Sequence, residues 1–181
     1  VVPTVTGSKL VEPLSGTFDN NKLTLEVKDI AKLDSSAMTL DDTDTIIEAV
    51  NKELRRDDVD GVVVTHGTDS MEETAIAVDT FQDSDKPVAL TGAMRPFDDP
   101  DPDGPDNLAL AVKTVTDPSN KGRGTFIAFA DRVIPARGAF KSDTAKADGF
   151  ANNNGAKQHQ RPKALKFKPL GNTRVDIIAA Y

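Results

Sequence analysis

The chain has 181 residues, a formal net charge of −7 at pH 7, no cysteine and only 5% aromatic residues. The negative charge argues against nucleic acid as the main partner because phosphates are bound by basic surfaces, and the absence of cysteine excludes disulfides and thiolate metal sites. No apolar run approaches the roughly 20 residues of a membrane span. We therefore expect one domain, or one domain and part of another, with a core of Val, Ile, Leu and Ala.

The first third of the chain predicts loops, one strand and a capped helix. Residues 1–20 are rich in Pro and Gly and are expected to be loop with one short helical turn. Apolar and polar residues alternate over 22–29, which predicts a strand. A helix is predicted over about 40–55 from the spacing of its apolar residues. Thr39 is its expected N-cap, and Asp42 completes a capping box.

Strands and helices then alternate. Short apolar runs at residues 59–65, 87–91 and 125–130 predict buried strands. Apolar residues at helical spacing predict helices over 70–81 and around 108–115. This alternation is typical of a three-layer α/β domain with a parallel sheet.

The last quarter is less regular. We interpret residues 133–140 as a hairpin return and residues 151–173, with their Asn, Lys and Pro, as a linker. Residues 174–181 have the pattern of one more strand. Because the sequence stops inside this apolar run, we expect the chain to be a piece of a longer protein.

Three residues with reactive side chains follow the strand at 59–65, namely His66, Thr68 and Asp69. Ligands of parallel sheets bind beyond the carboxyl ends of the strands, which is where this loop is expected. A threonine hydroxyl becomes a nucleophile when a base takes its proton. Lys141 is a candidate for that base, and Asp69 is placed to hold or orient it.

Each of these residues also has a simpler structural interpretation. Taken singly, Thr68 is a turn or cap residue and Lys141 a solvated surface lysine. We expect His66 to fix its loop through its ring nitrogens and His159 to lie on the surface. No His, Asp and Glu residues have a metal-ligand spacing, and there is no glycine-rich phosphate loop, so we expect no metal and no cofactor. Ser70 is the expected N-cap of the helix at 70–81, with Glu73 in the box position.

Taken together, these segments closely resemble bacterial L-asparaginases. Residues 65–74, Thr-His-Gly-Thr-Asp-Ser-Met-Glu-Glu-Thr, are similar to the second signature of that family. Residues 86–96 resemble the family's next strand and loop, and residues 103–108 the start of the following helix. The resemblance covers, with gaps, residues 3–150. It implies a flavodoxin-like, three-layer α/β N-terminal domain that is incomplete at both ends.

The resemblance also implies catalytic roles. Thr68 stands where the family has its second catalytic threonine, and Lys141 stands where a lysine hydrogen-bonds that threonine. Asp69 stands where an aspartate binds the amino group of the substrate. The implied reaction is hydrolysis of L-asparagine to L-aspartate and ammonia, with loop N–H groups stabilising the tetrahedral oxyanion.

Further substrate contacts are implied by the same comparison. Ser35 matches the serine that grips the substrate carboxylate, and Ala93 matches a loop residue whose backbone carbonyl faces the substrate amide. The implied substrate-binding set is therefore Ser35, Ser36, Thr68, Asp69 and Ala93. Ser36 replaces a glutamine found in many members, so substrate contacts are expected to differ there.

The chain departs from the family at both ends. The family's opening Thr-Gly-Gly-Thr-Ile-Ala motif, with its first catalytic threonine, has no counterpart, and Thr4 takes the position of the lid tyrosine. We expect a catalytic domain over residues 1–150, a linker over 151–173, and the first strand of a truncated C-terminal domain over 174–181. That second domain, in the family, lends an acidic residue to the neighbouring subunit.

Several alternatives stay open at this stage. The chain is either part of an asparaginase or a catalytically incomplete module that binds asparagine or aspartate. A glutaminase-asparaginase and an amidotransferase subunit are further possibilities, although no basic patch favours the latter. We expect a homodimer or homotetramer with no nucleic acid or membrane partner. We expect a cytoplasmic protein; periplasmic or secreted locations stay open because the natural N-terminus is expected to be missing.

Overall fold

The computed structural model describes residues 5–19, 22–153, 161–172 and 174. A four-stranded sheet with the order β1-β2-β3-β4 forms its centre. The first three strands run parallel, and β4 is antiparallel to β3. The strands are β1 (Val62–Thr65), β2 (Val88–Thr91), β3 (Thr125–Phe129) and β4 (Arg132–Pro135). The α/β prediction is confirmed, with a mixed rather than purely parallel sheet.

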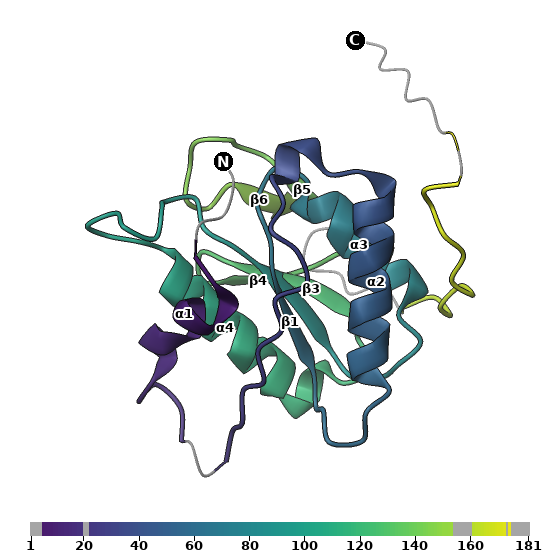
Figure 1. Ribbon diagram of the computed structural model, residues 1–181, viewed down its shortest axis with the longest axis horizontal. Coiled ribbons are helices and arrows are strands. Elements are labelled where there is room, and N and C mark those ends of the chain that lie inside the picture. Colours follow the sequence, from purple (N-terminus) through teal and green to yellow (C-terminus); the bar gives the residue numbers. More distant parts are fainter. Residues whose placement is uncertain (1–4, 20–21, 154–160, 173, 175–181) are drawn as a thin grey trace.

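Helices cover both faces of this sheet, which gives three layers (Figure 1). Helices α2 and α3 pack on one face, and α4, with α1 beside it, packs on the other. The helices are α1 (Gly7–Val11), α2 (Leu40–Leu54), α3 (Met71–Phe81) and α4 (Gly104–Thr116). Short 3-10 turns occur at Glu12–Leu14, Ser35–Ala37 and Pro118–Asn120. Within the described ranges, every helix is too short or too polar to cross a lipid bilayer.

The core follows from the alternation of side chains along the strands. In β2, Val88 and Leu90 join the cluster under α2 and α3, whereas Ala89 packs against Ala111 of α4. On the second face, Ala89 and Ala128 of the strands form a cluster with Ala111 and Val115 of α4. Leu90 has no exposed surface, and full burial of such a side chain contributes about 1.5–3 kcal/mol.

The predicted strand over residues 22–29 is wrong. The segment is extended but is assigned to no strand, and Leu25 is 41% exposed. Side chains tether it instead, because Lys28 Nζ lies 2.8 Å from Glu53 Oε1 and Asp29 Oδ1 accepts from Gly7 N at 2.9 Å. An alternating pattern predicts a strand only where a neighbouring backbone completes the ladder, and none of the described residues provides one here.

One capping prediction is confirmed and one is wrong. Thr39 and Asp42 form the expected capping box at the start of α2. Ser70 is the N-cap residue of α3 by position, but its side chain makes no capping bond, so the predicted box with Glu73 does not form. The Ser70 hydroxyl instead donates to the Ser35 carbonyl at 2.7 Å. The Ser70 hydroxyl, which the local sequence predicts to cap the helix, therefore bonds instead to a carbonyl from a distant part of the chain.

The predicted return over 133–140 divides into two elements. Strand β4 completes a tight hairpin with β3 through Ala130 and Asp131, whose φ angles are 48° and 59°. The chain then enters β5 (Ala139–Lys141), which pairs with β6 (Phe150–Asn152) in a separate two-stranded sheet. The hairpin is thus confirmed for its first half only.

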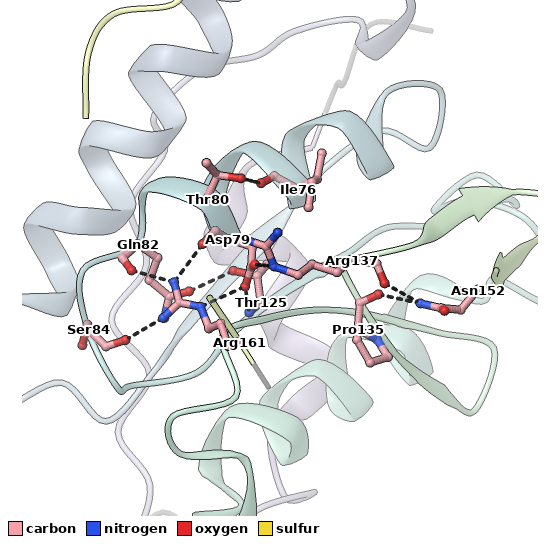
Figure 2. A network of polar contacts seen from close by, with 10 residues as sticks. All are labelled: Ile76, Asp79, Thr80, Gln82, Ser84, Thr125, Pro135, Arg137, Asn152 and Arg161. Carbon is pink, nitrogen blue, oxygen red and sulfur yellow. Dashed lines mark hydrogen bonds and ion pairs between the residues drawn. The ribbon is translucent and has the colours of Figure 1, made fainter. Parts of the chain in front are cut away.

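Part of the predicted linker is structured. Its first two residues belong to β6, and residues 161–172, which we call the strap, pack back on the helices. Figure 2 shows Arg161 at the start of the strap, bonded to the Asp79 side chain and to the backbone carbonyls of Asp79, in the last turn of α3, and of Gln82, just after it. Further along, Asp44 Oδ2 accepts from Leu170 N at 2.7 Å. The domain boundaries stay a prediction, and the predicted strand over 174–181 lies outside the described residues except for Arg174.

Candidate active site

The loop between β1 and α3 lies at the carboxyl end of the parallel strands, as predicted. His66 N donates to Thr91 O at 2.8 Å, which joins this loop to the end of β2. The two loops are so close that a Cβ atom at Gly92 would lie 2.2 Å from the His66 carbonyl oxygen. Only glycine fits at position 92. The loops that follow β1 and β2 therefore lie in direct contact at the carboxyl edge of the sheet.

The structure brings together the three predicted catalytic side chains. Lys141 Nζ donates to Thr68 Oγ1 at 3.0 Å and to Asp69 Oδ1 at 2.9 Å, across more than 70 residues of sequence. The lysine side chain is 10% exposed, whereas Asp69 is 53% exposed. The lysine is therefore held in place, and the aspartate keeps a face toward solvent. An amine at this distance from a hydroxyl can exchange a proton with it and can stabilise an alkoxide.

Ser35 joins the same site. Its Oγ accepts from Asp69 N at 3.3 Å, and the residue is 9% exposed. Gly67 makes this approach possible, because a Cβ atom there would lie 2.3 Å from Ser35 Oγ. Ser36 is exposed, and its hydroxyl donates to Asp34 Oδ1 at 2.7 Å. Ser36 thus bonds within its own turn.

Ala93 lies on the loop after β2, and two residues that the sequence did not single out hold this loop. Asp103 Oδ2 accepts from Met94 N at 3.0 Å, and Asn107 Nδ2 donates to Gly92 O at 3.0 Å. Both belong to the start of α4. In the sequence, Asp103 and Asn107 belong to a run of polar residues at the beginning of a predicted helix. Such a run indicates helix capping, but it does not indicate that these side chains bind the loop after β2.

His66 fixes the loop, as predicted. Its Nδ1 lies 2.6 Å from Gly67 O, and its Nε2 lies 3.0 Å from Thr74 Oγ1. A carbonyl can only accept, so Nδ1 carries the proton and Nε2 accepts from the threonine. Burial lowers the pKa of His66 below its usual value. The imidazole is therefore neutral, and its lone pair is already used, which argues against a role as general base.

Metal binding finds no support in the part of the chain that the structure describes, where no three His, Asp or Glu side chains gather as ligands. Two residues considered above, Thr4 and His159, lie outside the described residues.

The mixed α/β sheet and the polar side chains at its carboxyl edge define an α/β protein with a candidate ligand site at the strand ends. The chain belongs to the asparaginase family: residues 1–167 match the family model for the asparaginase N-terminal domain. This match confirms the family membership that the motif at residues 65–74 predicts.

Named relatives agree with this assignment. The chain is 46% identical to L-asparaginase 2 of Bacillus subtilis over 105 residues, which cover 58% of this chain and 28% of the relative. It is 37% identical to L-asparaginase 2 of Escherichia coli over 127 residues, 70% of this chain and 32% of the relative. A glutaminase-asparaginase of Pseudomonas aeruginosa is 33% identical over 149 residues, 82% and 36% of the two chains.

A solved structure shows the same fold. The crystal structure of a probable cytoplasmic L-asparaginase from Campylobacter jejuni matches with a TM-score of 0.66 and 41% sequence identity. The match covers 69% of this chain and 40% of the other. The chain thus spans about a third of the length of the curated relatives that it matches.

Proposed function

We propose that the protein containing this chain hydrolyses the side-chain amide of L-asparagine to L-aspartate and ammonia. The observation that carries this proposal is the bridge from Lys141 Nζ to Thr68 Oγ1 and Asp69 Oδ1, at 3.0 and 2.9 Å, at the carboxyl end of β1. Relatives named L-asparaginase and glutaminase-asparaginase support amide hydrolysis. The preference for Asn over Gln is not part of the proposal, because one methylene changes discrimination by only about 1–3 kcal/mol.

In the proposed mechanism, Thr68 Oγ or a water beside it attacks the amide carbon. In its neutral form, the Lys141 amine takes the proton of the attacking hydroxyl or water and later returns it to the leaving nitrogen, which departs as ammonia. Asp69 orients the lysine with one oxygen and presents its exposed face to the amino group of the substrate. Backbone N–H groups of the surrounding loops stabilise the oxyanion. Where Thr68 is the nucleophile, water then hydrolyses the acyl ester to release aspartate.

The remaining substrate contacts are proposed from position. Ser35 is buried beside Asp69 and is the proposed ligand of the substrate carboxylate. Ala93, on the loop that follows β2, is the proposed backbone contact of the amide. Ser36 completes the proposed set, and its exposed position next to Ser35 is the support for it. We propose no metal and no cofactor in this reaction.

Assembly and location are proposed on coarser grounds. We propose a homodimer or homotetramer, because the exposed Asp69 leaves the site open on one side for a neighbouring subunit to complete. We propose a cytoplasmic location from the likeness to a probable cytoplasmic enzyme, although another relative is named as periplasmic. We further propose the domain limits 1–150, 151–173 and 174–181.

The test is ammonia release from L-asparagine, measured on the 181-residue chain and on the natural polypeptide that carries it. Thr68→Ala and Lys141→Met are expected to lower kcat by at least about 100-fold, the usual contribution of a positioned acid or base. Thr116→Ala and Lys52→Met, which change exposed residues outside the site, serve as matched controls and are expected to keep full activity. Normal turnover by Thr68→Ala or Lys141→Met would refute the proposal.

A second candidate follows from the partial length of the chain. The 181 residues on their own form an incomplete module that binds asparagine or aspartate through Ser35 and Asp69 without turning it over. Titration calorimetry with L-aspartate separates the two possibilities. Binding without ammonia release by the 181-residue chain, together with activity of the longer polypeptide, supports this second candidate for the isolated chain.

A further inference from the structure

Lys141 lies on a small piece of structure that needs an anchor. Strands β5 and β6 pair only with each other, apart from the main sheet. The ribbon is fixed to the core on its β6 side, where Phe150 is 2% exposed and packs against Phe129, and Lys141 lies on the other strand. The placement of Lys141 Nζ near Thr68 Oγ1 therefore depends on what holds β5 to the rest of the domain.

Glu72 provides such a hold. Its Oε1 accepts from the backbone N–H of Lys141 at 3.0 Å. Glu72 lies in the first turn of α3, directly after the loop that carries Thr68 and Asp69. Lys141 is thus held at two points, its backbone by Glu72 of α3 and its Nζ by Asp69 of the preceding loop.

The strand pairing explains why this N–H is available. Lys141 is the partner of Phe150 in the antiparallel ribbon, and the next residue, Ser142, donates its N–H to Gly149 O at 2.7 Å. Hydrogen-bonded and non-hydrogen-bonded pairs alternate along such a ladder. The Lys141 N–H therefore points out of the ribbon, toward α3, where the Glu72 carboxylate meets it.

The second carboxylate oxygen of Glu72 indicates that Glu72 acts on Lys141 as a hydrogen-bond acceptor rather than through its negative charge. Glu72 Oε2 is buried and has no hydrogen-bond partner among the described residues. A buried oxygen without a hydrogen-bond partner costs free energy, so Oε2 does not stabilise the fold through a hydrogen bond. A neutral amide in its place keeps the one bond that is made.

We propose that Glu72 is a positioning residue that sets the distance between Lys141 Nζ and Thr68 Oγ1 by anchoring the β5 backbone to the start of α3. The inference rests on the proposed amide hydrolysis for its kinetic consequence. Its structural consequence, protection of the Lys141 amide, does not depend on any reaction.

The kinetic test compares Glu72→Ala with Glu72→Gln in the natural polypeptide that carries this chain. Loss of the anchor is expected to lower kcat for L-asparagine by about 10- to 100-fold, because displacement of a reacting group by about 1 Å costs up to that much. KM is expected to stay within about twofold, since Ser35 and Asp69 are not attached through Glu72. Glu72→Gln keeps the acceptor and is expected to keep kcat within about threefold of the unaltered protein.

Glu73 is the matched control. It is the next acidic residue in the same first turn of α3 and is exposed. Glu73→Ala removes the same favourable interaction with the helix dipole but no anchor, so it is expected to leave kcat unchanged. Should Glu72→Ala not fold, Glu72→Leu, which fills the space and accepts no hydrogen bond, takes its place.

Amide hydrogen exchange at Lys141 supplies the readout that is independent of turnover. The N–H is expected to exchange slowly in the unaltered protein, in Glu72→Gln and in Glu73→Ala, and at least about tenfold faster in Glu72→Ala. The proposal is overturned if Glu72→Gln loses as much kcat as Glu72→Ala, if Glu73→Ala does, or if exchange is the same in all four proteins. A complete lack of ammonia release together with the expected exchange pattern refutes the proposed function and leaves the anchor standing.

Discussion

Replacement of Asp79 by alanine is expected to destabilise the fold strongly. This residue, 3% exposed at the end of α3, accepts from Thr125 N at 2.9 Å and from Arg161 Nε at 3.2 Å through the same oxygen. Its other oxygen lies 2.8 Å from Arg137 Nε, an ion pair without hydrogen-bond geometry. Figure 2 shows these groups converging from α3, from the start of β3, from beyond β4 and from the strap.

The expected magnitude follows from what the substitution leaves behind. Breaking a buried ion pair by removing one partner costs about 3–5 kcal/mol, and an orphaned buried N–H, here that of Thr125, costs about 1–3 kcal/mol of that. Two features moderate the loss. Arg161 keeps its bonds to the carbonyls of Asp79 and Gln82, and Arg137 is 34% exposed and stays partly hydrated. We therefore expect Asp79→Ala to cost about 3 kcal/mol, the lower end of the range.

Urea unfolding followed by circular dichroism measures this cost. Asp79→Asn keeps an acceptor for Thr125 N and is expected to lose only about 1–2 kcal/mol. A double-mutant cycle with Arg161→Ala is expected to give a coupling of about 1–3 kcal/mol, because the two groups are in contact. A loss below about 1 kcal/mol for Asp79→Ala would refute the reasoning, since an unpaired buried Thr125 N–H alone accounts for that much.

Two further predictions concern the loops at the site. Gly92→Ala is expected to lower the free energy of unfolding, measured in urea, by about 1–3 kcal/mol, because the new Cβ meets the His66 carbonyl oxygen and the backbone must move. Gly104→Ala is the control, since its Cβ meets only the Ala93 Cβ, at 3.4 Å. Equal losses in the two variants would contradict the steric argument. The second prediction concerns pH. Burial depresses the pKa of His66 below 6.5, so the unfolded state binds the proton more readily, and stability is full above pH 6.5 and falls as the pH drops below it. His66→Gln is expected to flatten this part of the stability–pH curve, and an unchanged curve would argue against a buried neutral imidazole.

Most of the elements could be predicted from the sequence because their signals are local. The helix at Leu40–Leu54 follows from apolar spacing and a capping box within its own residues. The apolar runs became β1, β2 and β3 within a few residues of the expected limits. His66 could be given a loop-fixing role because its hydrogen-bond partners, Gly67 and Thr74, lie within eight residues of it.

The candidate site was only partly accessible in this way. The resemblance nominated Thr68, Asp69 and Lys141, but nothing in the spacing of those residues gives a 3.0 Å contact between Lys141 and Thr68. Glu72 and Asn107 were missed altogether. Each is polar in a helix start, where local sequence indicates a cap, and each bonds instead to backbone far away in the chain.

The sequence by itself therefore determined most of the helices and strands, which of their faces are buried, and the family to which the chain belongs. Only the tertiary structure decided which partner each polar group takes. Residues 22–29 carry a strand pattern but find no ladder, and Ser70 gives its hydroxyl to Ser35 rather than to its helix. The physical reason is the same in both cases. Periodicity and capping depend on neighbours a few residues away, whereas a hydrogen bond forms with whichever acceptor the packed chain brings within about 3 Å.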